Sequence, residues 1–403
     1  MNLRSVTAFL SFTDPISDDQ FRDLEGLLRA AREEFMRAGF PVQTTRVATQ
    51  PISEIAPRDL IRFARDLEAT CKAHDITFTG LGAVHADRKD ASLNLIDAIP
   101  DALAATENLF ASVQIASRQN GINLCAIQAS ARVIRSLAEI TPEGLGNYRF
   151  ATLANCSPHT PFFPVAYQQG IAPAFAIATE GAPIAVDAFS RAHNLEQARA
   201  NLVDAIERAA LSISRVANDL ATRFSFRFAG IDFSLAPYKE ESHSVGHALE
   251  ILTGAAFGER GTLFAAAFVT DCIQRANFSR VGFSGIFLPV LEDATIAARS
   301  SEYSIDSLLL YSSVCGTGLD TIPLPGDTSA DALAAILLDL ATLAVKLDKP
   351  LTARLIPIPN ARLGDSTHFD FPWFTNARMM ETRGALSREW LDANEWISFG
   401  AKT

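Results

Sequence analysis

YSSVCGTGLDTIPLPGDT, residues 311–328, is the stretch of this sequence that says most about how the chain folds. It follows the apolar run IDSLLL and holds three glycines and two prolines. Glycine lets the backbone adopt positive φ or approach a ligand closely, and Pro-Leu-Pro-Gly predicts a stiff turn. Asp327 or Thr328 would then cap a helix that begins near Ser329. Two readings stay open: a tight connection with a satisfied cap, and a loop lining a pocket, which we favour because rigid scaffolds carry functional loops.

Strand-like runs alternate with amphipathic helices along the rest of the chain. Strands are predicted at residues 5–12, 42–48, 76–80, 112–115, 148–154, 224–232, 285–289 and 351–358. Helices are predicted at 18–38, 57–74, 100–110, 123–140, 195–222, 243–252, 262–276 and 331–347. Strands separated by helices of this length predict an α/β architecture. No linker, low-complexity tract or repeat interrupts the pattern, so we expect one large α/β domain over residues 1–403.

Composition limits the partners and the compartment. The net charge is −11, which argues against nucleic acid or an anionic membrane surface as the main partner and favours a small molecule. The five cysteines are widely spaced and lack a CxxC pair, which fits reduced thiols in the cytoplasm. No uninterrupted apolar run is long enough to cross a bilayer, and the first residues read as a strand, not as a signal peptide.

Acidic residues recur after apolar runs. Asp232, Glu292, Asp293, Asp320 and Asp327 all stand in such places. Because α/β proteins bind ligands at strand ends, these acids could converge on one cavity and act as general acids or bases. Asp320, Asp327 and Glu292 are the candidate ligands for a divalent cation such as Mg²⁺ or Ca²⁺. Taken singly, each acid is more often an N-cap or a turn residue.

Glycines and arginines supply candidate binding groups for an anion. Backbone N–H groups near glycines at a helix start can hold a phosphate or carboxylate, although no Walker or dinucleotide motif is present, so NAD is not expected. Arg354 and Arg46 lie in apolar runs, where an arginine either pairs with acids or clamps an anion. The predicted substrate-binding residues are Gly258, Gly261, Thr262, Ser284, Gly316, Gly318 and Arg354.

Cysteine and histidine give weaker signals. Cys315 is a candidate nucleophile, although no histidine is near it in sequence to act as a base, and a buried thiol in a turn is the plainer interpretation. His243 and His247 have the spacing of a zinc pair, but Ser244 stands where a metalloprotease has its glutamate and Ser242 or Ser244 would equally cap the helix. Cys156 and His159 form a second polar cluster.

Several motifs together resemble one family. GIDFSLAP (230–237), the element at 258–262, GFSGIFLPVLED (282–293), VCGTGLDTIPLPGDT (314–328) and KPLTARLIPIP (349–359) are similar, in order, to motifs of the Domain of Unknown Function 711 family. Residues 149–167 and 43–51 resemble it as well. The resemblance implies a ten-stranded α/β barrel of two five-stranded halves, related to pyruvate formate-lyase and other glycyl radical enzymes. It implies no general activity, and Asn360 departs from the expected glycine.

The functional prediction combines these signals. The C-terminal glycines lack the arginine-valine setting of a radical glycine, so we expect no glycyl radical. We predict a cytoplasmic enzyme, a lyase or hydrolase, acting on a small anionic metabolite by acid–base or metal-assisted chemistry. The alternative is a non-catalytic binding or regulatory protein, and a homo-oligomer is possible in either case. Asp232, Asp320 and Arg354 should line one cavity together with the glycines of 258–261.

Overall fold

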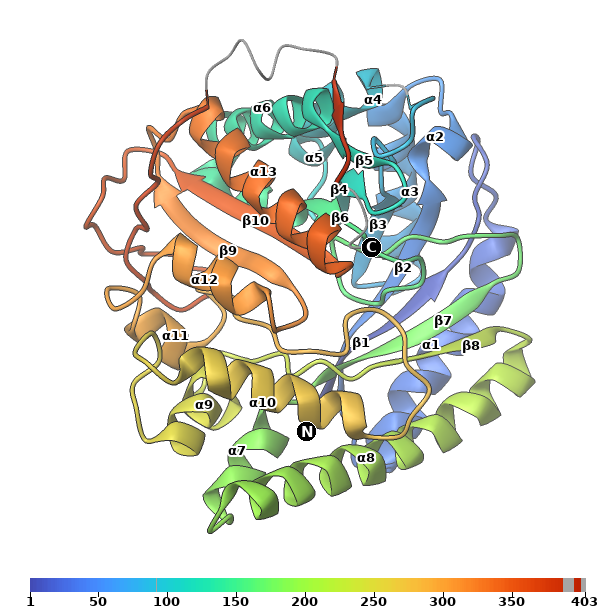
Figure 1. Ribbon diagram of the computed structural model, residues 1–403. Coiled ribbons are helices and arrows are strands. Elements are labelled where there is room, and N and C mark those ends of the chain that lie inside the picture. The colour runs from blue at the N-terminus through green and yellow to red at the C-terminus, as the bar shows by residue number, and fades with distance from the viewer. Residues whose placement is uncertain (92, 387–394, 400–403) are drawn as a thin grey trace.

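The computed structural model describes residues 1–91, 93–386 and 395–399 and shows a mixed α/β fold around a large central sheet (Figure 1). The strands are β1 (Asn2–Phe9), β2 (Val42–Pro51), β3 (Phe78–Gly82), β4 (Leu109–Ser117), β5 (Gly121–Asn123), β6 (Phe150–Ala154), β7 (Ala174–Glu180), β8 (Arg227–Asp232), β9 (Gly318–Pro325), β10 (Leu351–Ile358) and β11 (Trp396–Ile397). The helices are α1 (Asp19–Arg37), α2 (Ile52–Ile55), α3 (Leu60–Ala73), α4 (Asn94–Asp97), α5 (Ile99–Ala104), α6 (Leu124–Ile140), α7 (Ala182–Ser190), α8 (Leu195–Phe224), α9 (Val245–Thr253), α10 (Thr262–Arg275), α11 (Ala294–Ala298), α12 (Ile305–Ser312) and α13 (Ala330–Leu347). Two 3-10 helices, η1 (Pro142–Arg149) and η2 (Glu241–His243), complete the set of described elements. The α/β prediction is confirmed.

The sheet runs in the order β8-β7-β1-β2-β3-β4-β6-β10-β9, with β5 and β11 attached beside β4. Most neighbours in this order are parallel, and the β1–β7 and β6–β10 pairs are antiparallel. Parallel neighbours need crossover helices, which explains the alternation of strands and helices along the sequence.

The segment 280–289 runs between the two ends of this order. It makes isolated parallel bridges to the β8 side at Ile231–Arg280 and Leu235–Ile286, and to β9 at Pro289–Asp320. The predicted strand at 285–289 therefore lies in the right place, but it is present only as isolated bridges.

The stiff turn predicted at 323–328 is only partly right, because residues 323–325 belong to the buried strand β9 and the turn is confined to Gly326 and Asp327. Pro323 and Pro325 misled the prediction, since proline cannot donate to a strand ladder. In the structure β9 ends the strand order and its ladder is with β10, with an irregular register, which is where a sheet tolerates proline. The helix cap is also different: the Ser329 side chain accepts from Ala332 N–H, while Asp327 is exposed.

Other elements follow the prediction with shifted bounds. β10 and the start of α8 match it, and Ser244 caps α9 by accepting from His247 N–H, as one of the two alternatives had it. The predicted helix at 100–110 stops at Ala104, and β7 was missed although AFAIATE alternates as a strand does.

Helices cover the outside of the sheet (Figure 1). On α8, residues three or four apart turn one face inward and leave the rest polar: Ala198, Leu202, Ile206, Ala210, Ile213, Ala217 and Leu220 are buried. α8 contacts α1, α7 and α10, whereas α6 and α13 contact each other and β10. The sheet interior is therefore shielded from solvent.

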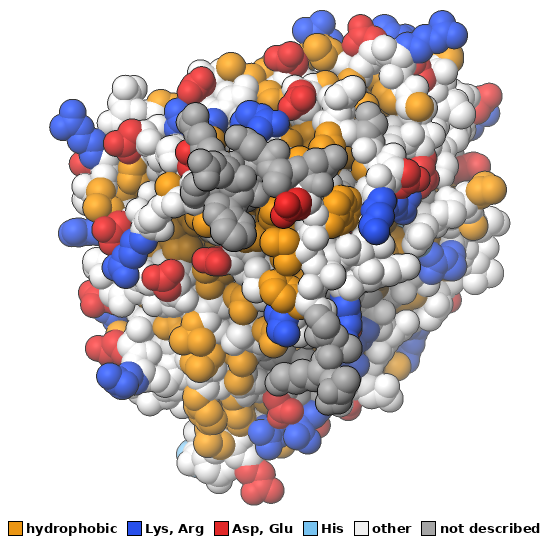
Figure 2. Space-filling view, turned by 45° about the horizontal axis from the view of Figure 1, so that its top comes forward, with side chains coloured by type: hydrophobic (Ala, Val, Ile, Leu, Met, Phe, Trp, Pro, Cys, Tyr) orange, Lys and Arg blue, Asp and Glu red, His pale blue; other side chains and the backbone are white. Residues whose placement is uncertain are grey.

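The surface carries mixed charge. Figure 2 shows Lys and Arg side chains interspersed with Asp and Glu on one face, where hydrophobic side chains gather in a band. That face has no single large basic area. Among the described helices, none has the length and hydropathy needed to cross a membrane.

Candidate functional site

A small interior cavity collects side chains from six strands of the sheet and from the loop that follows β8. Its lining comprises Arg4, Arg46, Phe78, Phe110, Tyr148, Phe162, Phe163, Ala236, Pro237, Phe287, Pro289, Glu292, Asp320 and Arg354. These residues lie on β1, β2, β3, β4, β9 and β10 and on the loops beside them. The free space is about 40 Å³, whereas a single water needs roughly 10–15 Å³. The cavity therefore suits a very small molecule or the polar end of a larger one.

Arg354 holds two carboxylates at one side of the cavity. Its Nε donates to Asp320 Oδ1, and a terminal nitrogen donates to Glu292 Oε1 at 2.8 Å. All three side chains are buried. Burial by itself lowers the pKa of Arg354, but the two carboxylates outweigh it, so the net pKa is raised. The predicted meeting of Arg354 with cavity acids is found for Asp320 and Glu292.

Arg46 faces the same cavity without such a partner. Its Nε donates to Thr44 Oγ1 at 2.9 Å, and its guanidinium lies 5.5 Å from the ring centre of Phe78 and 5.2 Å from that of Phe163. Among the described residues, no carboxylate lies within ion-pair distance of Arg46. Burial lowers the pKa of Arg46 to about 9, so it remains charged at neutral pH. A buried, charged guanidinium with unused donors is a ready anion ligand.

Arg4 and Tyr148 complete the polar lining. Arg4 donates to the Pro237 carbonyl and lies 3.9 Å from Glu180 Oε2. The Tyr148 ring lies 5.3 Å from the guanidinium of Arg354. Burial, followed by the charge of Glu292, raises the pKa of Tyr148 to about 12, so its hydroxyl stays protonated at neutral pH.

The lining thus holds three arginines and two carboxylates. Arg354 pairs with both acids, which leaves Arg46 and the loosely paired Arg4 to supply positive charge. A buried unpaired charge is costly, and an anion in the cavity would offset that cost.

Asp232 does not line this cavity, contrary to the prediction. It is fully buried at the end of β8, where it accepts from Ser234 Oγ at 2.6 Å and from the backbone N–H groups of Phe283 and Ser284 at 2.8 Å each. A Cβ on Gly282, at φ +65°, would collide with this carboxylate. Asp232 therefore fastens the segment 280–289 to β8, and Ser284 is part of the same clasp instead of a substrate contact.

We expect the Asp232 clasp to make stability depend on pH. Burial raises the pKa of Asp232 to about 6, against about 3.9 in the unfolded chain. The folded state then binds the proton more tightly, so the contribution of Asp232 to stability is largest below pH 4 and falls as pH rises to about 6. The advantage of the wild type over Asp232→Asn should be about 2–3 kcal/mol larger at pH 4 than at pH 7, measured by urea unfolding. An equal difference at both pH values would contradict this role.

Asp293 does not line the cavity and instead binds the first residues of two helices. Its carboxylate accepts from the backbone of Thr295 and Ile296 at the start of α11. It also accepts from Ser244 Oγ and from Val245 and Gly246 N–H at the start of α9. One buried acid thus caps two helices.

The three predicted metal ligands are not brought together. Asp320 and Glu292 bind Arg354, whereas Asp327 is exposed in the turn after β9. Within the described part of the chain, no group of three or more His, Cys, Asp or Glu side chains is placed to hold a metal ion. The carboxylates of the cavity are therefore arranged around a guanidinium.

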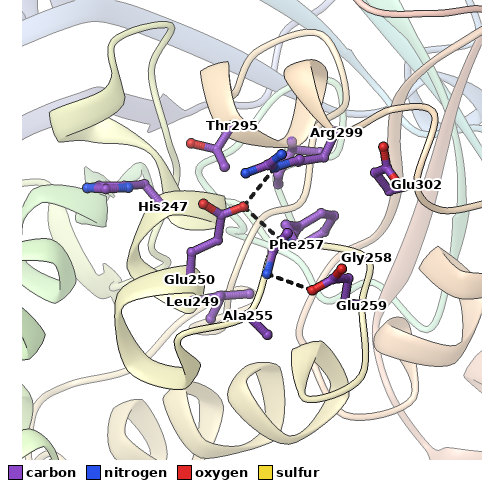
Figure 3. A network of polar contacts seen from close by, with 12 residues as sticks. His247, Leu249, Glu250, Ala255, Phe257, Gly258, Glu259, Thr295, Arg299 and Glu302 are labelled. Carbon is purple, nitrogen blue, oxygen red and sulfur yellow. Dashed lines mark hydrogen bonds and ion pairs between the residues drawn. The ribbon is translucent and has the colours of Figure 1, made fainter.

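Gly258, Gly261 and Thr262 lie in a separate polar network, so the prediction that they line the cavity is wrong. Thr262 Oγ1 accepts from Gly258 N–H at 3.1 Å and donates to the Glu259 carbonyl. Figure 3 shows the neighbouring loop: Glu250 accepts from Phe257 N–H and from Arg299. Most of these hydrogen bonds join residues of α9 and of the connection from α9 to α10, and they hold that connection in a compact conformation.

Gly316 and Gly318 pack closely against neighbouring backbone and do not line the cavity. A Cβ on Gly316 would lie 2.9 Å from the Cα of Gly285, and one on Gly318, at φ +99°, would collide with the Thr352 carbonyl. They let two backbone segments approach β9. Cys315, directly before them, is buried, is absent from the cavity lining, and its carbonyl accepts from Lys349 Nζ.

We expect Cys315 to react slowly. Burial raises the pKa of the Cys315 thiol, and a buried thiol presents little thiolate to a reagent. Iodoacetamide at pH 7 should label Cys315 at least about 100-fold more slowly in the native protein than in urea, as followed by peptide mass spectrometry. Rapid stoichiometric labelling of the native protein would instead indicate an activated nucleophile.

The candidate zinc pair His243 and His247 is not part of any group of three or more His, Cys, Asp or Glu side chains that could hold a metal ion among the described residues. His243 Nδ1 contacts Glu180 Oε1 at 2.9 Å, while His247 Nδ1 lies 3.5 Å from Glu241, so the two rings have different partners. His159 contacts Gln168, and Cys156 is buried with a pKa that burial raises.

The sequence analysis missed Arg4, Tyr148 and the phenylalanines of the cavity. One usable signal was present: Arg4, like Arg46 and Arg354, lies inside a strand-like apolar run. The aromatic lining carries no local signal, because a buried Phe in a strand is usually core.

Comparison with known proteins places the chain in one family. Residues 1–376 match the model of the family described as Uncharacterised ACR (DUF711). The chain belongs to this family. A UPF0210 protein of Pyrobaculum aerophilum is 34% identical over 361 residues, covering 85% of this chain and 79% of that protein. A UPF0210 protein of Methanosarcina acetivorans is 32% identical over 364 residues (85% and 78%), and one of Syntrophobacter fumaroxidans is 32% identical over 402 residues (92% and 88%). The family resemblance read from the motifs is confirmed.

Proposed function

We propose that this protein is a cytoplasmic enzyme that binds a small anionic metabolite in the interior cavity and acts on it by acid–base chemistry, as a lyase or hydrolase without a radical. The observation that carries the proposal is Arg46, a buried guanidinium with no carboxylate partner among the described residues. Arg4 adds a second positive charge nearby. An anion between them would gain charge-assisted hydrogen bonds in a site that excludes water.

Two side chains have the chemistry to move a proton beside that anion. Arg354 occupies only Oε1 of Glu292, and Oε2 has no hydrogen-bond partner among the described residues, so Glu292 can serve as the general base. Tyr148 keeps its proton and can donate to a developing negative charge. Asp320 positions Arg354.

The proposed setting is a closed ten-stranded barrel of two five-stranded halves, as in the pyruvate formate-lyase fold. Three observations support it: the bridges of 280–289 to both ends of the strand order, the antiparallel pairs β1–β7 and β6–β10, and lining residues drawn from strands of both halves. A closed barrel would place these strands around one axis. We propose the fold relation only, because fold does not carry function.

Non-catalytic binding is the second candidate. It is favoured by the way Arg354 holds both cavity acids, since a carboxylate oxygen that already binds a guanidinium is occupied by that contact. In either case the partner is a small molecule, not nucleic acid or membrane.

Anion binding can be tested by thermal unfolding at constant ionic strength. Acetate, inorganic phosphate and oxalate, each balanced with chloride, should raise the melting temperature in a saturable way, because a ligand that binds only the folded state stabilises it. The exposed Arg208→Met variant on α8 should respond like the wild type. If no anion gives a saturable shift, the proposal fails.

A further inference from the structure

A second hollow adjoins the anion cavity. Its lining includes Phe78, Phe110, Ile140, Tyr148, Phe371 and Trp373, and it holds about 390 Å³. We call it the apolar groove. It is nearly ten times larger than the cavity, so it has room for a substantial part of a metabolite.

The apolar groove and the cavity share the rings of Phe78, Phe110 and Tyr148. The Phe78 ring also lies against Arg46, and the Tyr148 ring lies against Arg354. On its other side Tyr148 contacts Phe371, whose centroid is 5.1 Å away. The groove and the cavity therefore adjoin at rings that contact the two guanidiniums.

Arg149, Thr106 and Thr141, which also line the groove, already have partners within the protein. Arg149 donates to the carbonyls of Leu103 and Leu109, and Thr106 Oγ1 donates to the Ala102 carbonyl. Thr141 Oγ1 binds both the Leu137 carbonyl and Gly146 N–H. What the groove offers to an occupant is mainly the apolar surface of its aromatic and aliphatic lining.

We infer, resting on the proposed function, that the ligand is an amphiphilic anion: its charged head lies at Arg46 and its hydrocarbon or aromatic part lies in the apolar groove. The groove is occupied by this part of the ligand because the two spaces adjoin through rings that contact both guanidiniums. The small size of the cavity agrees with this division, since it accepts little more than a carboxylate or a phosphate.

A chain-length series tests the inference. Binding of acetate, butyrate, hexanoate and phenylacetate would be measured by calorimetry at constant ionic strength. Burial of each methylene contributes about 0.8 kcal/mol, so affinity should rise about fourfold per methylene. Hexanoate, with four more methylenes, should then bind about 250-fold more tightly than acetate, and phenylacetate should also bind more tightly than acetate.

Substitutions in the groove test whether the increase in affinity with chain length arises there. Ile140 lines the groove and is 46% exposed, so Ile140→Ser should leave the fold intact. Ile140→Ser and Trp373→Ala should each lower the ratio of hexanoate to acetate affinity at least threefold while leaving acetate affinity unchanged. Ile171→Ser is the matched control, because Ile171 is 93% exposed and lies outside the groove.

The outcomes separate this inference from the proposed function. If acetate and phosphate bind but longer chains bind no better, the anion site stands and the inference is overturned. If the chain-length gain survives both groove variants, the apolar part lies elsewhere and the inference is likewise overturned. If no anion binds at all, both fail.

Discussion

Arg354→Met should lower the free energy of unfolding by about 3–5 kcal/mol at pH 7, the largest loss that we expect from a single cavity substitution. The reason is that Asp320 and Glu292 would remain buried next to a methyl group, without the cation that now binds both. Methionine keeps the length of the side chain, so the effect reports the lost charge more than lost packing.

The stability of Arg354→Met should also depend on pH, in a direction set by the two buried carboxylates. A buried carboxylate without a partner favours its protonated form, so the folded variant should bind more protons than its unfolded chain in acid. The stability deficit of Arg354→Met should therefore shrink between pH 7 and pH 5, as measured by urea unfolding. Arg208→Met serves as the control, with a change within about 0.5 kcal/mol at both pH values. A deficit below about 1 kcal/mol at pH 7 would show that the triplet is not the buried ion network described above.

Arg46→Met, unlike Arg354→Met, should stabilise the protein, and it should strongly weaken anion binding. Burial lowers the pKa of Arg46 to about 9, which means that the folded protein holds this charge at a cost. Replacing the buried cation with an apolar side chain should raise the free energy of unfolding by about 1–2 kcal/mol. Loss of the charge-assisted contact should weaken acetate and phosphate binding at least about 30-fold.

Both readouts are required for Arg46. If Arg46→Met is more stable than the wild type but still binds anions, the anion site lies at Arg4 or elsewhere. If Arg46→Met is less stable than the wild type, Arg46 is a structural residue. Urea unfolding and calorimetry on the same preparation distinguish these results, with Arg208→Met again as the matched arginine control.

The sequence by itself determined the local elements and the family. The spacing of apolar residues on α8 and α6 predicts helices because burial of one face repeats every three to four residues. β10 was predicted with its observed bounds from a short apolar run. The motifs from GIDFSLAP onward were sufficient for family membership. Arg46 and Arg354 were also recognisable as buried arginines, because each stands inside an apolar strand.

Only the tertiary structure decided which of these residues meet. Asp232, Asp293 and Asp320 look alike in sequence, yet the first clasps a segment, the second caps two helices and the third binds Arg354. A carboxylate takes its role from the donors that surround it, and those donors come from distant segments. The strand β9 likewise could not be predicted from its own prolines, since its place at the end of the strand order is what makes them tolerable. Arg46 on β2 and Arg354 on β10 share a cavity because strand order, which no local pattern encodes, brings both strands to it.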